Sequence, residues 1–378
     1  MMLLSYGDTA TETAVPALNI RTGIHPKVNK VVFWSVVVLG VIAAFIFGYM
    51  KAGTPGLLLT LAALVPFTAL VMISLICISR ASLPLGWRLA AAVWGGAGAT
   101  SMTFLLIGIQ NTIAVSSNQM DSVVVQAAMV EESAKALFLF MVLVFSRKHI
   151  RTPLMGAMMG LLVGAGFAFV ENIIYFSNAY LQGGSEAFWS IFLARAVMSF
   201  FLHSLATLFT GLFIGYAVSK QFTFWKRMLT TTTGLIAAMT VHGMWNGSAS
   251  LTTVSTRWNL MYGFFWVPFV LTIAIVIIFI VRADRKRKNQ ELLFSSKAGV
   301  IRPRQAERMS DRKERKNVYR AKKTHEVILW ERSVSVAEFW RQEKLSLPNK
   351  PKFERRKSKI TQKRDKELLR LASVHEVV

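Results

Sequence analysis

The stretch SVVVQAAMVEESAKALFLFMVLVF, residues 122–145, has the length and apolarity of a membrane-spanning helix but carries three charges in its middle, on Glu131, Glu132 and Lys135. A charged side chain at the centre of a bilayer costs roughly 2.5–3.5 kcal/mol on insertion scales, so such residues face the interior of a bundle and often mark function. On a helix, Lys135 lies one turn from both glutamates. An internal ion pair would explain one glutamate and the lysine, but it leaves the second glutamate unmatched.

Similar apolar runs recur along most of the chain. Its 378 residues are 53% hydrophobic, and the mean hydropathy of +0.44 suits a polytopic membrane protein better than a soluble one. A spanning helix needs about 20 mainly apolar residues. Eight stretches meet this requirement: 31–50, 57–79, 89–109, 122–145, 153–176, 190–218, 229–247 and 260–281. We therefore predict an all-α fold, a membrane helix bundle with about eight transmembrane helices.

Basic residues are unevenly divided between the predicted loops, which indicates the orientation. The basic residues of one set of short loops are Arg80, Arg88, Arg147, Lys148, Arg151, Lys220, Lys226 and Arg227. The opposite set has only Lys51 and Arg257. Because cytoplasmic loops carry the excess of lysine and arginine, we predict a multi-pass protein of the plasma membrane with both termini in the cytoplasm.

The C-terminal part of the chain differs in composition. Residues 282–378 contain 29 lysines and arginines against 13 aspartates and glutamates, and so hold most of the net charge of +24. Basic residues beside a span can bind anionic lipids, at about 1 kcal/mol each. Since the charge belongs to this tail, we expect no specific nucleic-acid binding. The predicted parts are a cytoplasmic N-terminal segment 1–30, a transmembrane domain 31–281, and a basic, partly disordered cytoplasmic tail 282–378.

Polar side chains on three further predicted helices lie at a similar depth to the glutamate pair. Glu171 and Asn172 follow a stripe of small residues spaced by four, formed by Gly156, Gly160, Gly164 and Ala168, which predicts the close approach of another helix. His203 lies on the polar face of span 190–218, and His242 and Asn246 are one turn apart on span 229–247. At about 1.5 Å per residue, all of these groups fall in the outer half of the membrane. Separate ion pairs, each stabilising its own helix, would have no reason to lie at the same depth. We therefore predict that these groups line a common polar cavity.

The composition of this cavity suits hydrolysis. Two carboxylates and two imidazoles can position and deprotonate a water molecule, with or without a metal ion, and an asparagine can donate a hydrogen bond to a developing oxyanion. The sequence contains no His-Glu-x-x-His, Gly-x-Ser-Gly or Gly-x-Gly-Asp motif, and its lone Cys77 excludes cysteine zinc sites. The pattern therefore favours peptide-bond hydrolysis inside a membrane by carboxylates and histidines.

At these residues the chain resembles the PrsW family of bacterial intramembrane proteases, which are relatives of the type II CAAX prenyl endopeptidases. The matching elements cover roughly 120–250 and are, in order, Glu131-Glu132-Ser133-Ala134-Lys135, Phe167-Ala168-Phe169-Val170-Glu171-Asn172, His203, and His242-Gly243-Met244-Trp245-Asn246. The resemblance implies a protease of the bacterial plasma membrane that cleaves single-span membrane proteins, notably anti-sigma factors, near the extracytoplasmic side.

The resemblance also implies roles for individual residues. Glu131 or Glu132 would activate the water molecule, and the residues alone do not decide between them. His203 and His242 would hold the water or a metal ion, and Asn246 would stabilise the oxyanion. These five residues are the predicted catalytic set.

Three more residues would support that set, namely Lys135, Glu171 and Asn172. Lys135 stands one position before the arginine of the CAAX relatives, and Glu171 stands where those relatives have a histidine. A divalent metal ion such as zinc is a candidate cofactor, with His203, His242 and Glu171 as its candidate ligands.

Two other functions fit parts of the pattern. Buried glutamate, lysine and histidine also serve proton-coupled transporters, although the chain has no obvious inverted repeat and its polar groups cluster on one side of the membrane. A non-catalytic membrane scaffold that acts through the basic tail is the second alternative. The three hypotheses predict different results: a peptidase loses all function when Glu131 or Glu132 becomes glutamine while the fold persists. A scaffold that acts through its tail tolerates that change and fails on truncation after Arg282, and a permease shows flux in liposomes.

Overall fold

Helices form every element of secondary structure in the described part of the chain. The computed structural model describes residues 30–81, 83, 85–113, 127–146, 150, 152–220 and 222–252, with scattered residues between 266 and 314. The α-helices are α1 (Lys30–Ala52), α2 (Thr54–Ala81), α3 (Leu85–Val93), α4 (Thr100–Ile113), α6 (Ala127–Phe145), α7 (Pro153–Phe192), α8 (Leu202–Ser219) and α9 (Phe224–Thr252). Two short π-helices accompany them: η1 (Trp94–Ala99) joins α3 to α4, and η4 (Leu193–Met198) follows α7. The all-α prediction is confirmed for these ranges.

The chain divides into two compact units. The first is Ile24–Arg285, and the second combines Met1–Gly23 with Lys286–Val378. All the helices named above belong to the first unit. In the second unit, the Asn289 side chain donates a hydrogen bond to the carbonyl of Ser310 at 3.2 Å. The predicted N-terminal segment and basic tail lie almost wholly outside the described residues, so these two parts stay predictions.

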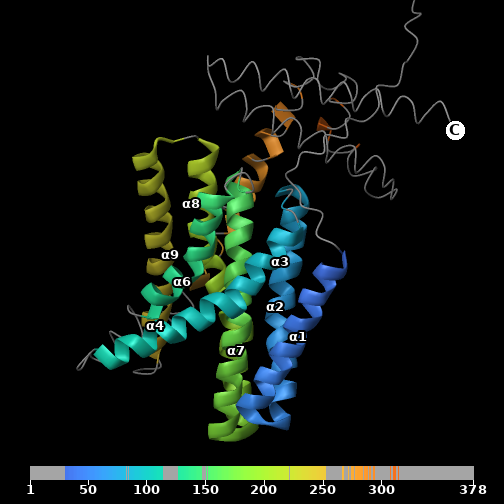
Figure 1. The fold of residues 1–378 in the computed structure, drawn as a ribbon, viewed down its shortest axis with the longest axis vertical. Coiled ribbons are helices and arrows are strands. Elements are labelled where there is room, and N and C mark those ends of the chain that lie inside the picture. The colour runs from blue at the N-terminus through green and yellow to red at the C-terminus, as the bar shows by residue number, and fades with distance from the viewer. Residues whose placement is uncertain are drawn as a thin grey trace, which may run out of the picture. The chain divides into compact units, whose positions relative to one another are not determined.

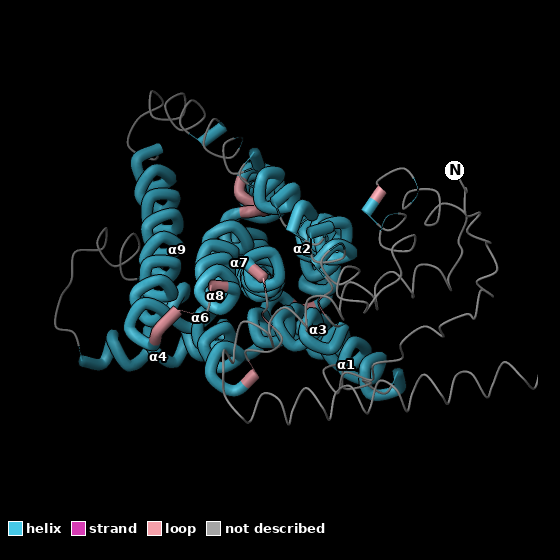
Figure 2. The backbone as a smooth tube through the Cα atoms, turned by 90° about the horizontal axis from the view of Figure 1, so that it is seen from above, coloured by secondary structure: helices cyan, strands magenta, loops and turns pink. Residues whose placement is uncertain are grey.

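Helix α7 is central to the first unit. Figures 1 and 2 show α1, α2 and α3 on one side of it and α6, α8 and α9 on the other. Its most extensive packing is against α8 and then α2, and α8 packs in turn on α9. Met158, Met159 and Phe176 of α7 are completely buried, or nearly so, in this packing. The core therefore lies along α7, and among its polar residues Asn172 and Ser177 are buried against neighbouring helices.

Small residues let α7 and α8 approach until their backbones touch. A Cβ atom added to Gly160 would meet the carbonyl oxygen of Thr207, and one added to Gly164 would meet the carbonyl oxygen of His203. The stripe predicted from the sequence is thus part of the α7–α8 interface. This close approach holds His203 against the helix that carries Glu171.

The predicted loop 177–189 is wrong, because helix continues through most of it. Non-helical backbone is confined to Gly183 and Gly184, and Gly184 has a φ of 65°, which favours glycine. The chain reverses there, since the ring of Phe188 returns to 5.7 Å from that of Phe176, twelve positions earlier. This aromatic packing keeps both arms helical, and it places the segment before α8 beside the middle of α7.

The predicted span 190–218 is also not one continuous helix. The end of α7 passes into η4, the backbone leaves helical geometry at Ser199 (φ −121°, ψ 14°), and α8 begins at Leu202. The amide and hydroxyl of Ser199 both donate to the carbonyl of Ala194, at 3.0 and 2.8 Å. These five-residue bonds replace the regular helical ladder just before His203.

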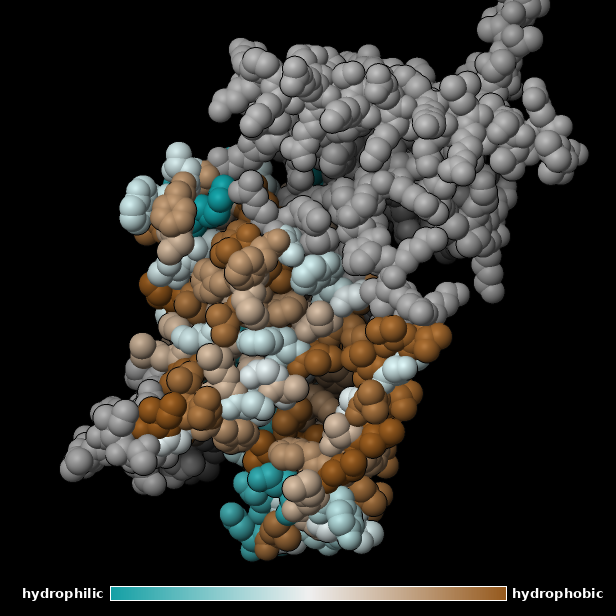
Figure 3. All heavy atoms as spheres, viewed as in Figure 1, coloured by the Kyte–Doolittle hydropathy of each residue, from teal (hydrophilic) through white to brown (hydrophobic). Residues whose placement is uncertain are grey.

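Four stretches of the described chain are long and apolar enough to cross a membrane: Trp34–Ala52, Thr54–Ile73, Leu85–Ile109 and Pro153–Ser219. Helix α6 is not among them, because it holds three charged residues within 19 positions. Figure 3 shows apolar side chains over much of the visible surface of the described helices, and α1 exposes residues such as Leu39 and Ile46. The predicted span 260–281 lies mostly outside the described residues. A total of eight spans, and the sides on which the termini lie, stay predictions.

Candidate active site

The three charged residues of α6 lie on one buried face of that helix. The ammonium of Lys135 is 2.8 Å from Oε1 of Glu132 and 3.2 Å from Oε2 of Glu131. It also lies 3.8 Å from the centroid of the Phe167 ring on α7. Lys135 and Glu132 are fully buried, whereas Glu131 keeps 10% of its side-chain surface exposed. One ammonium therefore serves both carboxylates, which accounts for the glutamate that a single ion pair leaves over.

Glu132 connects three helices. Its Oε1 lies 3.0 Å from Nδ1 of His242 on α9, in addition to the contact with Lys135. Its Oε2 accepts a hydrogen bond of 3.0 Å from the hydroxyl of Thr207 on α8. Both oxygens are thus engaged by protein groups, so Glu132 fixes the positions of α8 and α9 relative to α6.

His203 stands between two groups of opposite charge. Its Nδ1 is 3.0 Å from the ammonium of Lys135, and its Nε2 is 2.8 Å from Oε2 of Glu171. An ammonium can only donate hydrogen bonds and a carboxylate can only accept them. The ring is therefore neutral with its proton on Nε2, where it donates to Glu171, and the lone pair of Nδ1 faces α6.

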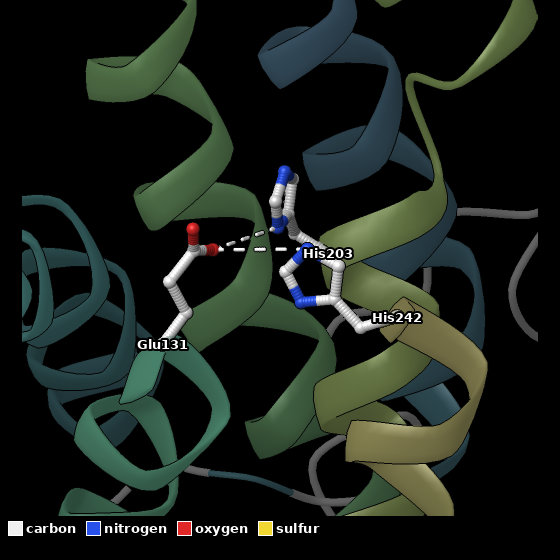
Figure 4. Close-up of side chains that lie close together, drawn as sticks. All are labelled: Glu131, His203 and His242. Carbon is white, nitrogen blue, oxygen red and sulfur yellow. Dashed lines mark ion pairs between the residues drawn. The ribbon is translucent and has the colours of Figure 1, made fainter. Parts of the chain in front are cut away.

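Glu131, His203 and His242 come from three helices and point toward one another (Figure 4). Oε2 of Glu131 lies 3.8 Å from Nδ1 of His203 and 3.8 Å from Nε2 of His242. One donor atom from each residue falls within 4.8 Å of the other two, and all three residues are buried. The two imidazole rings meet edge to face, with centroids 4.9 Å apart. We call these three residues the triad.

The donor set of the triad fits a divalent metal ion. Two imidazole nitrogens and one carboxylate are a common ligand set of catalytic zinc, which leaves a coordination position free. Metal-binding histidines usually give their other ring nitrogen to a carboxylate, and here His242 has Glu132 and His203 has Glu171 in that place. The structure thus groups Glu131, rather than the predicted Glu171, with the two histidines. The ammonium of Lys135 contacts two of the three donor atoms, Oε2 of Glu131 and Nδ1 of His203. Metal binding would require it to leave both atoms and keep its contact with Glu132.

Glu171 and Asn172 belong to a second cluster, next to the triad. Nη2 of Arg195 donates to Oε2 of Glu171 at 2.6 Å, and Nε donates to Oδ1 of Asn172 at 2.9 Å. The guanidinium carbon lies 4.0 Å from the centroid of the Tyr175 ring. Tyr175 is 42% exposed, and Glu171 and Arg195 keep 14% and 18% of their side-chain surface. The cluster therefore lies toward the more open side of the polar centre.

Two residues of this centre, Arg195 and Thr207, are missing from the predicted site. The sequence holds a signal for both, since they share a four-residue spacing with His203, but that spacing does not reveal their partners. Asn246 lies one turn after His242 on α9, as predicted, and is half-buried. Its part in the chemistry stays a prediction.

The fold and the buried centre define a helical membrane protein with carboxylate and imidazole groups gathered in its interior. The family model described as PrsW family intramembrane metalloprotease matches residues 83–279, more than half of the chain. The chain therefore belongs to this family, and it is an intramembrane protease embedded in the lipid bilayer. No curated protein and no solved structure matches the chain.

Proposed function

We propose that the protein hydrolyses a peptide bond of single-span membrane proteins, near the extracytoplasmic side of the membrane. Proteins like anti-sigma factors are the expected substrates. The observation that carries this proposal is the triad, in which three helices bring Glu131, His203 and His242 together in a buried site. A tail-dependent scaffold has no need of this donor set, and against a transporter the family match favours the peptidase.

Glu131 is the better candidate for the carboxylate that handles the reacting water. Both oxygens of Glu132 are already engaged by Lys135, His242 and Thr207, which gives Glu132 a role in holding these groups. Oε2 of Glu131 faces both histidines, and its side chain is the more exposed of the two. A water between these groups can give its proton to Glu131 as its oxygen attacks the carbonyl carbon, and that proton then passes to the departing amine nitrogen.

In a metal-dependent version of the reaction, Glu131, His203 and His242 would hold a divalent metal ion, with zinc as the first candidate, and Glu131 would then be a ligand rather than the proton acceptor. When bound, the ion would polarise the water molecule and the peptide carbonyl as a Lewis acid. Glu132 and Glu171 would orient the two imidazoles through their other ring nitrogens. Asn246, one turn beyond His242, would donate a hydrogen bond to the oxyanion.

The test of the proposed function identifies the substrate at the same time. Membrane proteomes are compared between cells with the intact protein and cells with the Glu131→Gln, Glu132→Gln double variant at equal abundance. We expect one or a few single-span proteins to accumulate at full length with the variant and to be shortened by the intact protein, with new termini in the outer half of the span. Indistinguishable proteomes, under envelope stress as well, would argue against the peptidase.

Metal removal gives a separate prediction for the cofactor. The purified protein should bind about one divalent ion per chain, and exhaustive chelation should abolish cleavage until zinc is restored. The His242→Gln variant should lose the ion while keeping its helix content, since the imidazole supplies a donor atom. Metal analysis of the dialysed proteins measures this. If chelation leaves cleavage unchanged and no ion binds, the metal part of the proposal is wrong and the carboxylates act without it.

A further inference from the structure

Arg195 has an unusual place in the fold. It lies within the π-helix η4, on the segment that returns from the Gly183–Gly184 turn, where the chain is about to leave helical geometry at Ser199. Such π-helical turns are rare and occur frequently at functional sites. Here the irregular backbone places Arg195 opposite Glu171, Asn172 and Tyr175 of α7.

Three groups of α7 hold the guanidinium in one orientation. It donates to Glu171 at 2.6 Å and to Asn172 at 2.9 Å, and it stacks 4.0 Å from the ring centroid of Tyr175. A planar guanidinium with fixed donor directions suits such a combination, whereas a lysine ammonium acts as a point charge and cannot replace it. The orientation of Arg195 is thus more restricted than that of an arginine held by a single surface ion pair.

The contact with Glu171 continues to the triad. One carboxylate oxygen, Oε2 of Glu171, accepts from Arg195 and also from Nε2 of His203, at 2.8 Å. The opposite nitrogen of that ring, Nδ1, then faces Lys135 and Glu131. The direction in which the His203 lone pair points therefore depends on where Glu171 is held.

We propose that Arg195 is a positioning residue that acts through Glu171 to hold the Nε2–H of His203 and so fix the orientation of the ring, with Nδ1 directed at Glu131. Without the guanidinium, Glu171 is free to leave its place, and the Nε2–H of the imidazole loses its acceptor, while Lys135 still faces Nδ1. The role of this arrangement in catalysis rests on the proposed function, but the arrangement itself can be measured without metal or substrate.

The test uses metal-free full-length protein in lipid bilayers, labelled with ¹⁵N in its histidines, with the His203 signals assigned from a His203→Gln variant. In the intact protein we expect one tautomer of His203, with Nδ1 unprotonated and Nε2 protonated. Because Lys135 still faces Nδ1, Arg195→Met should keep this tautomer but shift the Nε2 signal as the hydrogen bond to Glu171 weakens, and Glu171→Gln should do the same. Arg195→Lys should restore the Nε2 signal of the intact protein only in part, because it keeps the charge but not the two-point contact.

Zinc affinity supplies a second readout. Loss of a carboxylate partner behind a metal-binding histidine typically weakens binding about 10–100-fold, so Arg195→Met and Glu171→Gln should each show a loss of this size. The double variant should lose no more than either single variant if Arg195 works through Glu171. The matched control is Arg227→Met, which removes a partly buried arginine bonded to the carbonyl of Phe222 and should change neither readout.

The outcomes separate this inference from the proposed function. A His203 signal and a zinc affinity unchanged in a folded Arg195→Met variant would overturn the inference, as would additive losses in the double variant. If the Nε2 signal of His203 follows Arg195 as expected, the inference holds even where the Glu131 and Glu132 variants show that the protein is not a peptidase.

Discussion

The Glu131→Gln variant should lose substrate cleavage on the order of 10³-fold, while its unfolding temperature stays close to that of the intact protein. The amide keeps the shape of the side chain but cannot take a proton from water and is a poor metal ligand. The fold should persist because Lys135 still has Glu132 at 2.8 Å, and Glu132 keeps its bonds to α8 and α9. Cleavage rates of a purified single-span substrate in lipid vesicles, at saturating and limiting concentration, measure the effect.

A matched control for this variant is Glu186→Gln. Glu186 is an exposed residue on the returning arm of α7, so the same chemical change there should leave the cleavage rate unchanged. A Glu131→Gln variant that cleaves at the rate of the intact protein would contradict the role given to Glu131. If Glu132→Gln were then inactive but stable, the assignments of the two glutamates would have to be exchanged.

The Lys135→Met variant should lose stability rather than only activity. It leaves Glu131 and Glu132 side by side in the buried centre without the ammonium that both of them contact. Breaking a buried ion pair by removing one partner costs about 3–5 kcal/mol, because a charge is left uncompensated. Methionine fills a similar volume, so the loss is electrostatic. Thermal or denaturant unfolding of the metal-free protein in detergent measures it.

A second substitution tests that explanation. Adding Glu132→Gln to Lys135→Met removes one negative charge for the positive charge lost, and should recover most of the stability without recovering activity. The control Lys51→Met removes an exposed lysine at the end of α1 and should change the free energy of unfolding by no more than about 0.5 kcal/mol. A Lys135→Met variant as stable as the intact protein would show that the buried charges are not mutually dependent.

Helical periodicity was sufficient to predict much of the centre. The i,i+3 and i,i+4 spacing of Lys135 from the two glutamates placed all three on one face of a helix, and the structure has them in contact. The four-residue stripe around Gly160 predicted a close helix contact, and it forms part of the α7–α8 interface. These features depend on one helix at a time, which is why the sequence reveals them.

Contacts between helices could not be predicted in the same way. Glu171 was expected among the metal ligands, yet its carboxylate lies behind His203 because Arg195 holds it there. That contact exists because the chain reverses at Gly184 and then passes through a π-helix, and neither the sharpness of the turn nor the change of helical register follows from apolar periodicity. Which donors face one another is decided by the packing of α6, α8 and α9.

The most direct test of hydrolysis at the triad is cleavage in water enriched in ¹⁸O. The purified protein in lipid vesicles is incubated with the single-span substrate that the proteome comparison identifies, and the new C-terminus is analysed by mass spectrometry. The proposed chemistry predicts that the new carboxylate carries one ¹⁸O atom, and that the Glu131→Gln variant yields no such product. Cleavage without ¹⁸O in the new carboxylate, or labelled product at an equal rate from the Glu131→Gln variant, would contradict it.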